Sequence, residues 1–181
     1  MIERDSERMS PVSFRLMTAV FRVVDIIFPR IDRRVGAFDI REGMIVVDYG
    51  CGPGRYTAKL ARLVGSPGFV YAVDIHELAI GAVERKIQKL GLKNVKPVLA
   101  NGYDSTLPTD IADVVCALDM FFGIKDPPAF LGELRRILKP QGTLIIDDGH
   151  QRRSTTRQKI MSSGVWAISE ESRDHLKCKP V

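Results

Sequence analysis

Cysteine is scarce in this chain of 181 residues, and the thiols present, Cys51, Cys116 and Cys178, are odd in number and far apart. A disulfide framework needs pairs of cysteines and a zinc site needs closely spaced ones, so neither is expected. Two of the three lie in apolar segments or in a glycine-rich turn. We therefore expect the cysteines to be reduced and structural.

Long apolar runs are also missing. The most hydrophobic segment, residues 12–28, is interrupted by Arg15, Arg22 and Asp25, whereas a transmembrane helix needs roughly 20 apolar residues. The opening sequence, MIERDSERMS, mixes charges of both signs, and no small-residue cleavage site follows it. A secretory signal is therefore not expected, and the sequence predicts a cytoplasmic protein.

Residues 12–28 instead predict a hydrophobic N-terminal helix, because their few polar side chains recur at helical spacing. The broad apolar arc of such a helix needs a cover. We expect it to pack on the sheet or over a pocket as a lid. Contact with a membrane surface or with a second copy of the chain stays open as an alternative, and the former would make the protein peripheral to a membrane.

Aromatic residues are absent from the two densest basic groups, Arg30/Arg33/Arg34 and Arg152/Arg153/Arg157/Lys159. The net charge of +5 and the isoelectric point near 9.2 fit a nucleic-acid partner, but such a surface usually combines basic side chains with aromatic rings that stack on bases. We interpret both groups as solvated surface and expect no nucleic-acid partner. Internal repeats and low-complexity tracts are missing too, and 181 residues with 45% hydrophobic content predict a single domain.

The chain does contain apolar runs that alternate with helical patterns. The expected strands are residues 44–48, 69–74, 95–100, 112–118 and 143–147. Alternation of this kind predicts an α/β fold with a doubly wound, mostly parallel sheet. Helices are expected at 56–64 and 78–90, and a third, through Phe130 and Ile137, is expected to end at residues 139–142.

The predicted division of the single domain is an N-terminal helical segment at 1–39, a cofactor-binding core at 40–150, and a C-terminal helix and strands at 151–181. The last strands are expected to close the sheet as an antiparallel hairpin.

The most informative stretch is VVDYGCGPGRYT, residues 46–57. An apolar strand ends there in an aspartate and breaks into Gly50, Gly52 and Gly54. Glycines at this position let a backbone approach a ligand closely. A nucleoside-bearing cofactor is the expected occupant.

Polar residues cluster where the other predicted strands end, which is the ligand edge of a doubly wound sheet. Asp74 ends the second strand, where its carboxylate can accept both ribose hydroxyls, and Ile75 offers an apolar face to adenine. The later strand ends contribute Asn101, Gly102, Tyr103, Leu118, Asp119, Asp147, Asp148 and His150.

A dinucleotide-dependent dehydrogenase is the first alternative, but its motif is G-x-G-x-x-G. Here the glycines follow G-x-G-x-G, and Arg55 takes the place of the third dinucleotide glycine. The pattern favours a cofactor without a pyrophosphate.

With these residues, the chain resembles the class I S-adenosylmethionine-dependent methyltransferases, and most closely the small-molecule branch of the ubiquinone/menaquinone biosynthesis C-methyltransferases. The resemblance covers residues 40–150. It rests on four segments: D-x-G-x-G-x-G at 48–54, Val73-Asp74, the G-Y-D-S-T-L-P run at 102–108, and E-L-R-R-I-L-K-P-Q-G at 133–142.

The resemblance implies a Rossmann-like methyltransferase fold and S-adenosylmethionine as cofactor. Asp48 would order the glycine turn, the three glycines would admit the methionine end, Asp74 would bind the ribose, and Ile75 and Leu118 would flank adenine. Asn101, Gly102 and Tyr103 complete the expected cofactor residues. The family has an acidic residue for the adenine amino group where this chain has Tyr103.

Methyl transfer to a hydroxyl or a carbon acid needs a base, and the candidates are Asp119 and His150. The hydrophobic N-terminal segment and Met120-Phe121-Phe122 suggest a small, apolar acceptor. No metal is expected, although Asp119 with Asp147 and Asp148 keeps a Mg²⁺-dependent, catechol-type O-methyltransferase open. A non-catalytic module that binds the cofactor and contacts a membrane is the other alternative.

The run Asp126-Pro127-Pro128 resembles part of a motif of amino-methylating nucleic-acid enzymes. It does not directly follow a predicted strand, and Ala129 stands where that motif has its aromatic residue. We interpret it as the turn that opens a helix.

Overall fold

A computed structural model of the protein describes residues 8–27 and 31–181. Its sheet has seven strands in the order β3-β2-β1-β4-β5-β7-β6. The strands are β1 (Ile45–Tyr49), β2 (Phe69–Asp74), β3 (Val95–Leu99), β4 (Ala112–Ala117), β5 (Leu138–Ile146), β6 (Trp166–Glu171) and β7 (Leu176–Pro180). The first five are parallel, and β7 pairs antiparallel with both β5 and β6. The doubly wound, mostly parallel sheet and its closing hairpin are confirmed.

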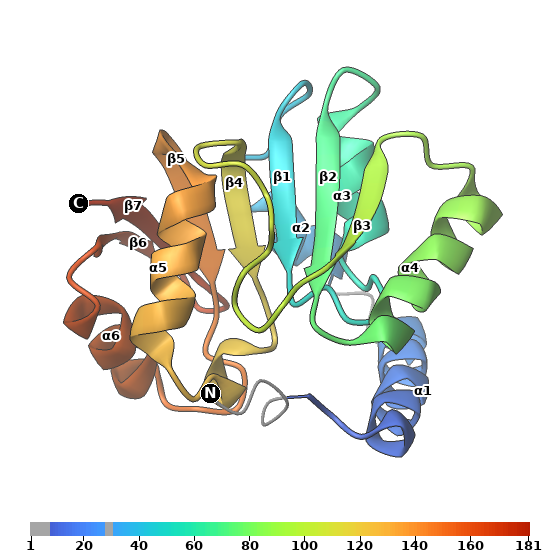
Figure 1. Ribbon diagram of the computed structural model, residues 1–181, viewed down its shortest axis with the longest axis horizontal. Helices are drawn as coiled ribbons and strands as arrows, with labels where there is room; N and C mark the ends of the chain where they lie inside the picture. The colour runs from blue at the N-terminus through green and yellow to red at the C-terminus, as the bar shows by residue number, and fades with distance from the viewer. Residues whose placement is uncertain (1–7, 28–30) are drawn as a thin grey trace.

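Helices cover both faces of this sheet (Figure 1). In the described part of the chain they are α1 (Pro11–Ile27), α2 (Ile31–Gly36), α3 (Thr57–Val64), α4 (Glu77–Leu90), α5 (Pro127–Ile137) and α6 (Arg153–Ser162), with a short 3₁₀ turn η1 (Phe121–Gly123). One core cluster joins α2, α3 and α4 to the sheet, and the other joins α5 and α6 to the opposite face.

Strand β1 lies in the middle of the sheet because it has no polar face to show to water. Val46 and Val47 are both fully buried, one in each core cluster. The chain continues from β1 to β2 and β3 on one side, and β4 and β5 add on the other. The strand order therefore reverses between β1 and β4, and the carboxyl ends of these two strands are where a doubly wound sheet binds its ligand.

The helix ends follow the signals in the sequence. Gly91 ends α4 in the left-handed conformation, with φ 62°, as glycine commonly does at helix ends. The Asp126 carboxylate accepts a hydrogen bond of 3.1 Å from the Ala129 N–H, and Pro127 occupies the first turn of α5. The interpretation of this run as a helix-opening turn is confirmed.

The boundary between α5 and β5 differs from the prediction. Residues 139–142, where the third helix was expected to end, already belong to β5. The strand starts early because Leu138 pairs with Ala112 ahead of a register shift in β4. Gly142 permits the irregularity, since a Cβ there would lie 2.5 Å from Leu138 Cδ1.

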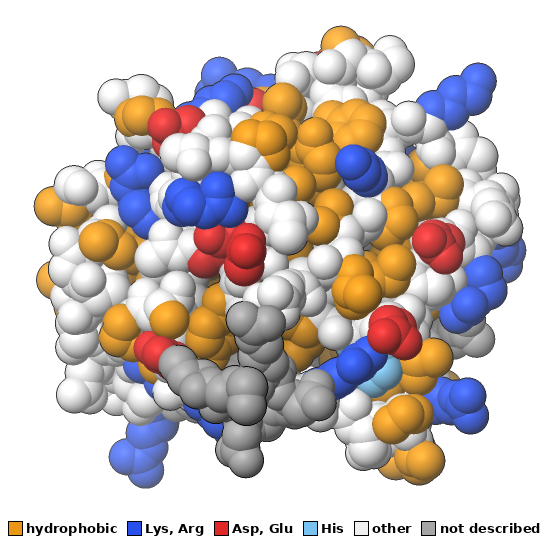
Figure 2. Space-filling view, viewed as in Figure 1, with side chains coloured by type: hydrophobic (Ala, Val, Ile, Leu, Met, Phe, Trp, Pro, Cys, Tyr) orange, Lys and Arg blue, Asp and Glu red, His pale blue; other side chains and the backbone are white. Residues whose placement is uncertain are grey.

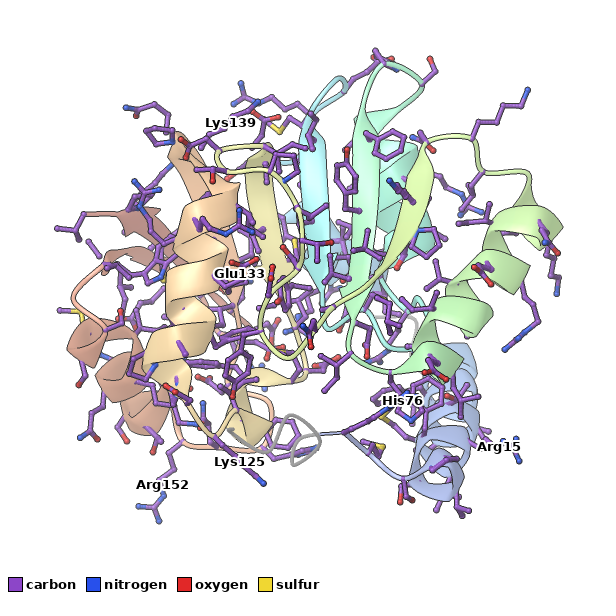
Figure 3. All side chains as sticks on the ribbon, viewed as in Figure 1. Arg15, His76, Lys125, Glu133, Lys139 and Arg152 are labelled. Carbon is purple, nitrogen blue, oxygen red and sulfur yellow. The ribbon has the colours of Figure 1, made fainter. Side chains whose placement is uncertain are left out.

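Helix α1 lies at the carboxyl edge of the sheet, beside the start of α4 (Figure 1). It begins one residue before the predicted helix of residues 12–28, and residue 28 lies outside the described residues. Phe14 is 6% exposed and packs on the His76 ring with centroids 4.7 Å apart. Figure 3 shows His76 between α4 and α1. The expected packing on the rest of the chain therefore holds for this residue.

A stripe of α1 is nevertheless uncovered. Val12, Leu16, Val20 and Val23 are 75%, 66%, 51% and 56% exposed. Their spacing of four, four and three residues places them on one face of the helix. Figure 2 shows hydrophobic side chains gathered over α1 at the lower right. Among the described residues, no helix has both the length and the hydropathy needed to cross a membrane.

Candidate functional site

The glycine turn leaves the carboxyl end of β1 and is held by the neighbouring strand. The N–H groups of Gly50 and Cys51 donate to the carbonyl of Val73, at 2.8 and 3.0 Å. Gly50, Gly52 and Gly54 have φ angles of 73°, 51° and 70°. This left-handed region costs other residues roughly 1–2 kcal/mol each, which explains three glycines within five residues.

The surroundings of these glycines differ. A Cβ on Gly50 would lie 2.9 Å from Met120 Cγ, whereas a Cβ on Gly52 would meet nothing within 4 Å. The turn is therefore packed against the segment after β4 on one side and open on the other. Open space beside a bare backbone is what a ligand in close contact with this turn requires.

Asp74 ties the glycine turn to the start of α4. Its Oδ2 accepts the Gly52 N–H and its Oδ1 accepts the His76 N–H, both at 2.8 Å. Burial raises the pKa of Asp74, against these backbone hydrogen bonds, which lower it. His76 is 6% exposed, and it caps α4 through Nδ1 while Nε2 bonds to the Met9 carbonyl at 3.0 Å. His76 is therefore part of the hydrogen-bonded connection between β2 and α4 and is not exposed to solvent.

Asp48 lies beneath the same turn and is 2% exposed. Its Oδ2 accepts a hydrogen bond of 2.6 Å from the Thr57 hydroxyl, at the start of α3. Burial raises the pKa of Asp48 to about 6, although the bond from Thr57 opposes the shift. A buried carboxylate that is costly to ionise favours a cationic group nearby.

The expected adenine-side residues are spread over a wider area. Asn101 and Gly102 lie in a tight turn closed by the Asn101 N–H to the Asp104 carbonyl at 2.9 Å. Tyr103 points toward α5, where its ring lies 5.8 Å from that of Phe130. Its hydroxyl accepts from the Asp126 N–H at 3.2 Å. Both Ile75, half-buried, and Leu118, 4% exposed, pack against core clusters.

A group of five charged and polar residues lies at the carboxyl ends of β4 and β5, and we call it the carboxyl-edge network: Arg34, Arg55, Tyr56, Asp119 and Asp147. Asp119 Oδ2 accepts from the Tyr56 hydroxyl and from Arg55 Nη1, each at 2.7 Å. Arg34 Nη1 bonds Asp119 Oδ1 at 3.1 Å, and its Nη2 bonds Asp147 Oδ2. The network joins α2 and the start of α3 to the ends of two strands.

The two carboxyl groups of this network have different environments. For Asp119, burial favours a higher pKa, but the bond from Tyr56 and the charge of Arg34 outweigh it, and the pKa is lowered. For Asp147, which is 3% exposed, burial dominates and the pKa is raised. The pKa values of the two carboxyl groups are therefore shifted in opposite directions.

Arg34 corrects one interpretation of the sequence. The basic group at residues 30–34 was expected to be solvated. Arg33 is exposed, as expected, and residue 30 lies outside the described residues. The side chain of Arg34, in contrast, is only 16% exposed. The available signal was its spacing, because Arg34 shares one face of the short helix α2 with Ile31 and Val35. An arginine on that face points into the protein.

The carboxylates considered for Mg²⁺ are paired with arginines. Asp119 and Asp147 share Arg34, and Asp148 bonds Arg153 Nε at 2.8 and 2.9 Å. Within residues 8–27 and 31–181, no group of three or more histidine, cysteine or acidic residues has an arrangement that could hold a metal ion.

His150, the second candidate base, is exposed after β5. Its ring contacts that of Phe122, with centroids 4.8 Å apart. The structure gives it no bond to the carboxyl-edge network. Unlike His150, Asp119 is connected to the glycine turn, because the next residue, Met120, packs against Gly50.

A cavity of about 500 Å³ lies at the other end of the strands. Its lining includes Met44, Asp113 and Lys139, which precede or begin β1, β4 and β5, and Figure 3 shows Lys139 at that opposite edge. Lys139 and Asp113 are already paired at 2.6 Å. This cavity is therefore separate from the glycine turn and contributes nothing to it.

Residues 40–176 match a protein family described as the methyltransferase domain. The chain belongs to this family. The match confirms the resemblance to class I S-adenosylmethionine-dependent methyltransferases, whose cofactor is S-adenosylmethionine, and the chain is similar to members of their ubiquinone/menaquinone branch.

Two curated relatives and one solved structure show how this methyltransferase compares with known proteins. The ubiquinone/menaquinone biosynthesis C-methyltransferase of Vibrio campbellii is 34% identical over 107 residues, covering 59% of this chain and 41% of the relative. The demethylmenaquinone methyltransferase of Geobacillus stearothermophilus is 31% identical over 110 residues, 59% of this chain and 46% of the relative. The methyltransferase thus spans less than half the length of these relatives.

The match to a solved structure covers more of the chain than the sequence matches do. A SAM-dependent methyltransferase from Aquifex aeolicus superposes with a TM-score of 0.81 at 24% identity, covering 96% of this chain and 100% of that one. The Rossmann-like methyltransferase fold is therefore confirmed.

Proposed function

We propose that this methyltransferase transfers the methyl group of S-adenosylmethionine to a small, apolar acceptor with a hydroquinone ring. The glycine turn carries the proposal, because it is tied to Asp74 at Gly52 and open beside Gly52. The acceptor class is suggested by the relatives, which are named for ubiquinone and menaquinone biosynthesis.

The residues around the turn suit the parts of this cofactor. The buried Asp48 carboxylate, with Thr57 as its donor, favours a positive charge such as the methionine amine. Each Asp74 oxygen accepts one backbone N–H and has a further lone pair for a ribose hydroxyl, and Ile75 is half-buried next to it. Asn101, Gly102, Tyr103 and Leu118 stay proposed as adenine-side residues.

The cofactor supplies an electrophilic methyl group on a sulfonium sulfur. The task of the protein is to align the acceptor and to exclude water. Asp119 is proposed to accept the hydrogen bond, and then the proton, of the acceptor hydroxyl, because it follows β4 at the carboxyl edge of the sheet and the next residue, Met120, packs against Gly50 of the glycine turn. His150 is the second candidate, from the exposed loop after β5.

The activity is tested with radiolabelled S-adenosylmethionine and a reduced, short-chain demethylmenaquinone. We expect a methylated product by mass spectrometry and an equal amount of S-adenosylhomocysteine. Calorimetry with S-adenosylhomocysteine separates the alternatives: binding without transfer to any hydroquinone would favour a non-catalytic module, and folded protein that gives no heat would contradict the assigned cofactor site. A requirement for Mg²⁺ would revive the catechol-type alternative.

The exposed stripe of α1 supports a second part of the proposal, that this helix rests on an anionic membrane surface. The stripe, Val12 to Val23, lies at the carboxyl edge of the sheet, where an apolar acceptor would enter. Arg15 points outward from the same helix (Figure 3), and the net charge of +5 suits an anionic surface.

Flotation with vesicles of phosphatidylglycerol and phosphatidylcholine tests this contact. We expect Leu16→Asp to abolish flotation, whereas Met161→Asp, at a 58% exposed position on α6, should leave it unchanged. If Leu16→Asp instead dissociates a dimer in sedimentation and no variant floats, a second copy covers the stripe and the membrane contact is wrong.

The protein is proposed to act in the cytoplasm, at this membrane surface. Its three cysteines are free and buried, as suits a reducing compartment. The division of the chain at 1–39, 40–150 and 151–181 stays a prediction.

A further inference from the structure

Arg34 reaches from α2 across the carboxyl edge of the sheet and contacts both carboxylates of the carboxyl-edge network. Its Nη1 lies 2.7 Å from the Tyr56 hydroxyl and 3.1 Å from Asp119 Oδ1. Its Nη2 bonds Asp147 Oδ2 and, at 3.1 Å, the Asp174 carbonyl in the turn between β6 and β7. One guanidinium therefore joins four segments that are far apart in the sequence.

The conformation of Asp119 depends on these partners. Its φ of 57° lies in the left-handed region, which a non-glycine residue adopts only where its surroundings hold it. The N–H of Asp119 donates to both oxygens of Asp147 at 3.0 Å. The carboxylate receives donors from Tyr56, Arg55 and Arg34. Backbone and side chain of Asp119 are thus fixed by separate contacts.

Burial of the Arg34 side chain destabilises the fold at one atom. The Nε–H of Arg34 is buried and has no partner, one of two such atoms that the described residues show. An unpaired buried donor is destabilising. An ion pair of this kind is retained more readily where orientation of the charged groups matters.

We propose that Arg34 is a positioning residue for methyl transfer, which holds the Asp119 carboxylate at the acceptor side of the glycine turn. Met120, the residue after Asp119, packs over Gly50. A change in the backbone of Asp119 would therefore move Met120 against the glycine turn. Without the guanidinium, Asp119 and Asp147 would face each other with less compensating positive charge. This inference rests on the proposed function, in which Asp119 accepts the acceptor proton.

The test compares Arg34→Lys and Arg34→Met with Arg33→Met, a control at the preceding, exposed position of α2. Lysine keeps the charge but lacks the planar fork that spans two carboxylates. We expect Arg34→Met to lower kcat by about 100-fold, as a misplaced catalytic group does, and Arg34→Lys to lower it less. The KM for the acceptor and the Kd of S-adenosylhomocysteine should be unchanged, and Arg33→Met should match the wild type.

A double-mutant cycle with Asp119→Asn distinguishes positioning from a structural role. If Arg34 acts through Asp119, the Arg34→Lys change should cost nothing further once Asp119 is asparagine. Arg34→Lys with wild-type kcat, or losses of the two changes that multiply, would overturn the proposal. The Lys variant carries the test even if Arg34→Met does not fold. Wild-type protein without turnover would instead contradict the proposed function, and this inference with it.

Discussion

Replacing Asp48 by asparagine is expected to change how the stability of the protein depends on pH. Asp48 is 2% exposed, and burial raises its pKa from the ordinary 3.8 to about 6 in the folded protein. A raised pKa means that the folded state binds the proton more tightly than the unfolded state does. The resulting stabilisation is complete below pH 3.8 and is lost as the pH rises through about 6.

The size of this effect follows from the two pKa values. At about 1.4 kcal/mol for each pH unit between them, ionising Asp48 lowers the free energy of unfolding by about 3 kcal/mol in total. About 1.4 kcal/mol of this loss falls between pH 5 and pH 8, with the remainder at lower pH. Asparagine does not ionise. The new amide needs an acceptor and costs stability, but by the same amount at both pH values.

The assay is urea unfolding at pH 5 and pH 8, followed by circular dichroism. The free energy of unfolding of Asp48→Asn minus that of the wild type should be about 1.4 kcal/mol larger at pH 8 than at pH 5. Asp147, whose pKa is also raised, is present in both proteins and does not contribute to the difference. Glu84→Gln, at an exposed position on α4, should show no such change. The same difference at both pH values would refute the reasoning.

Three further changes test the glycine turn and α1. Gly50→Ala adds a Cβ 2.9 Å from Met120 Cγ at a φ of 73°; the affinity for S-adenosylhomocysteine by calorimetry should fall at least about tenfold. Asp74→Asn replaces an oxygen that accepts backbone N–H groups, so the same affinity should fall by a similar, about tenfold, factor. Phe14→Ala removes a ring that is 6% exposed, and amide hydrogen exchange should quicken in α1 while β1 is unchanged.

Each change has its own control or contrary result. Gly164→Ala has a similar φ, 71°, with nothing within 4 Å, and should bind as the wild type does. Equal losses at Gly50 and Gly164 would show general strain instead of a specific contact. Unchanged affinity in Asp74→Asn would remove the ribose role, and a lower melting temperature of the sheet in Phe14→Ala would mean that α1 supports the whole fold.

The fold was predictable to a large extent because hydrophobic periodicity is a local property. Strand β2 was predicted with its observed bounds, since its apolar residues lie between turn-forming neighbours. The start of β5 was not predicted, because its first residue, Leu138, pairs with Ala112 ahead of a register shift. A local sequence pattern does not show how distant strands pair. Gly142, which permits the shift, looked like an ordinary turn residue.

The candidate site divides in the same way. The glycine turn and the position of Asp74 at the end of β2 were predictable from spacing, because positive φ angles favour glycine and a strand end is a local feature. The role of these residues in cofactor binding stays a prediction. The spacing of Arg34 on α2 indicates that its side chain points into the protein, but nothing near it in the sequence indicates its partners, Asp119 and Asp147.

The sequence by itself therefore determined the alternation of strands and helices, the glycine turn and the family, because each of these rests on short local patterns. Only the tertiary structure decided that Asp119 is held by Arg34, a residue 85 positions away, and that Val12 and its neighbours on α1 stay uncovered. The physical reason is that ion pairing and burial depend on which distant surfaces meet, and chain topology sets that only after the strands have paired.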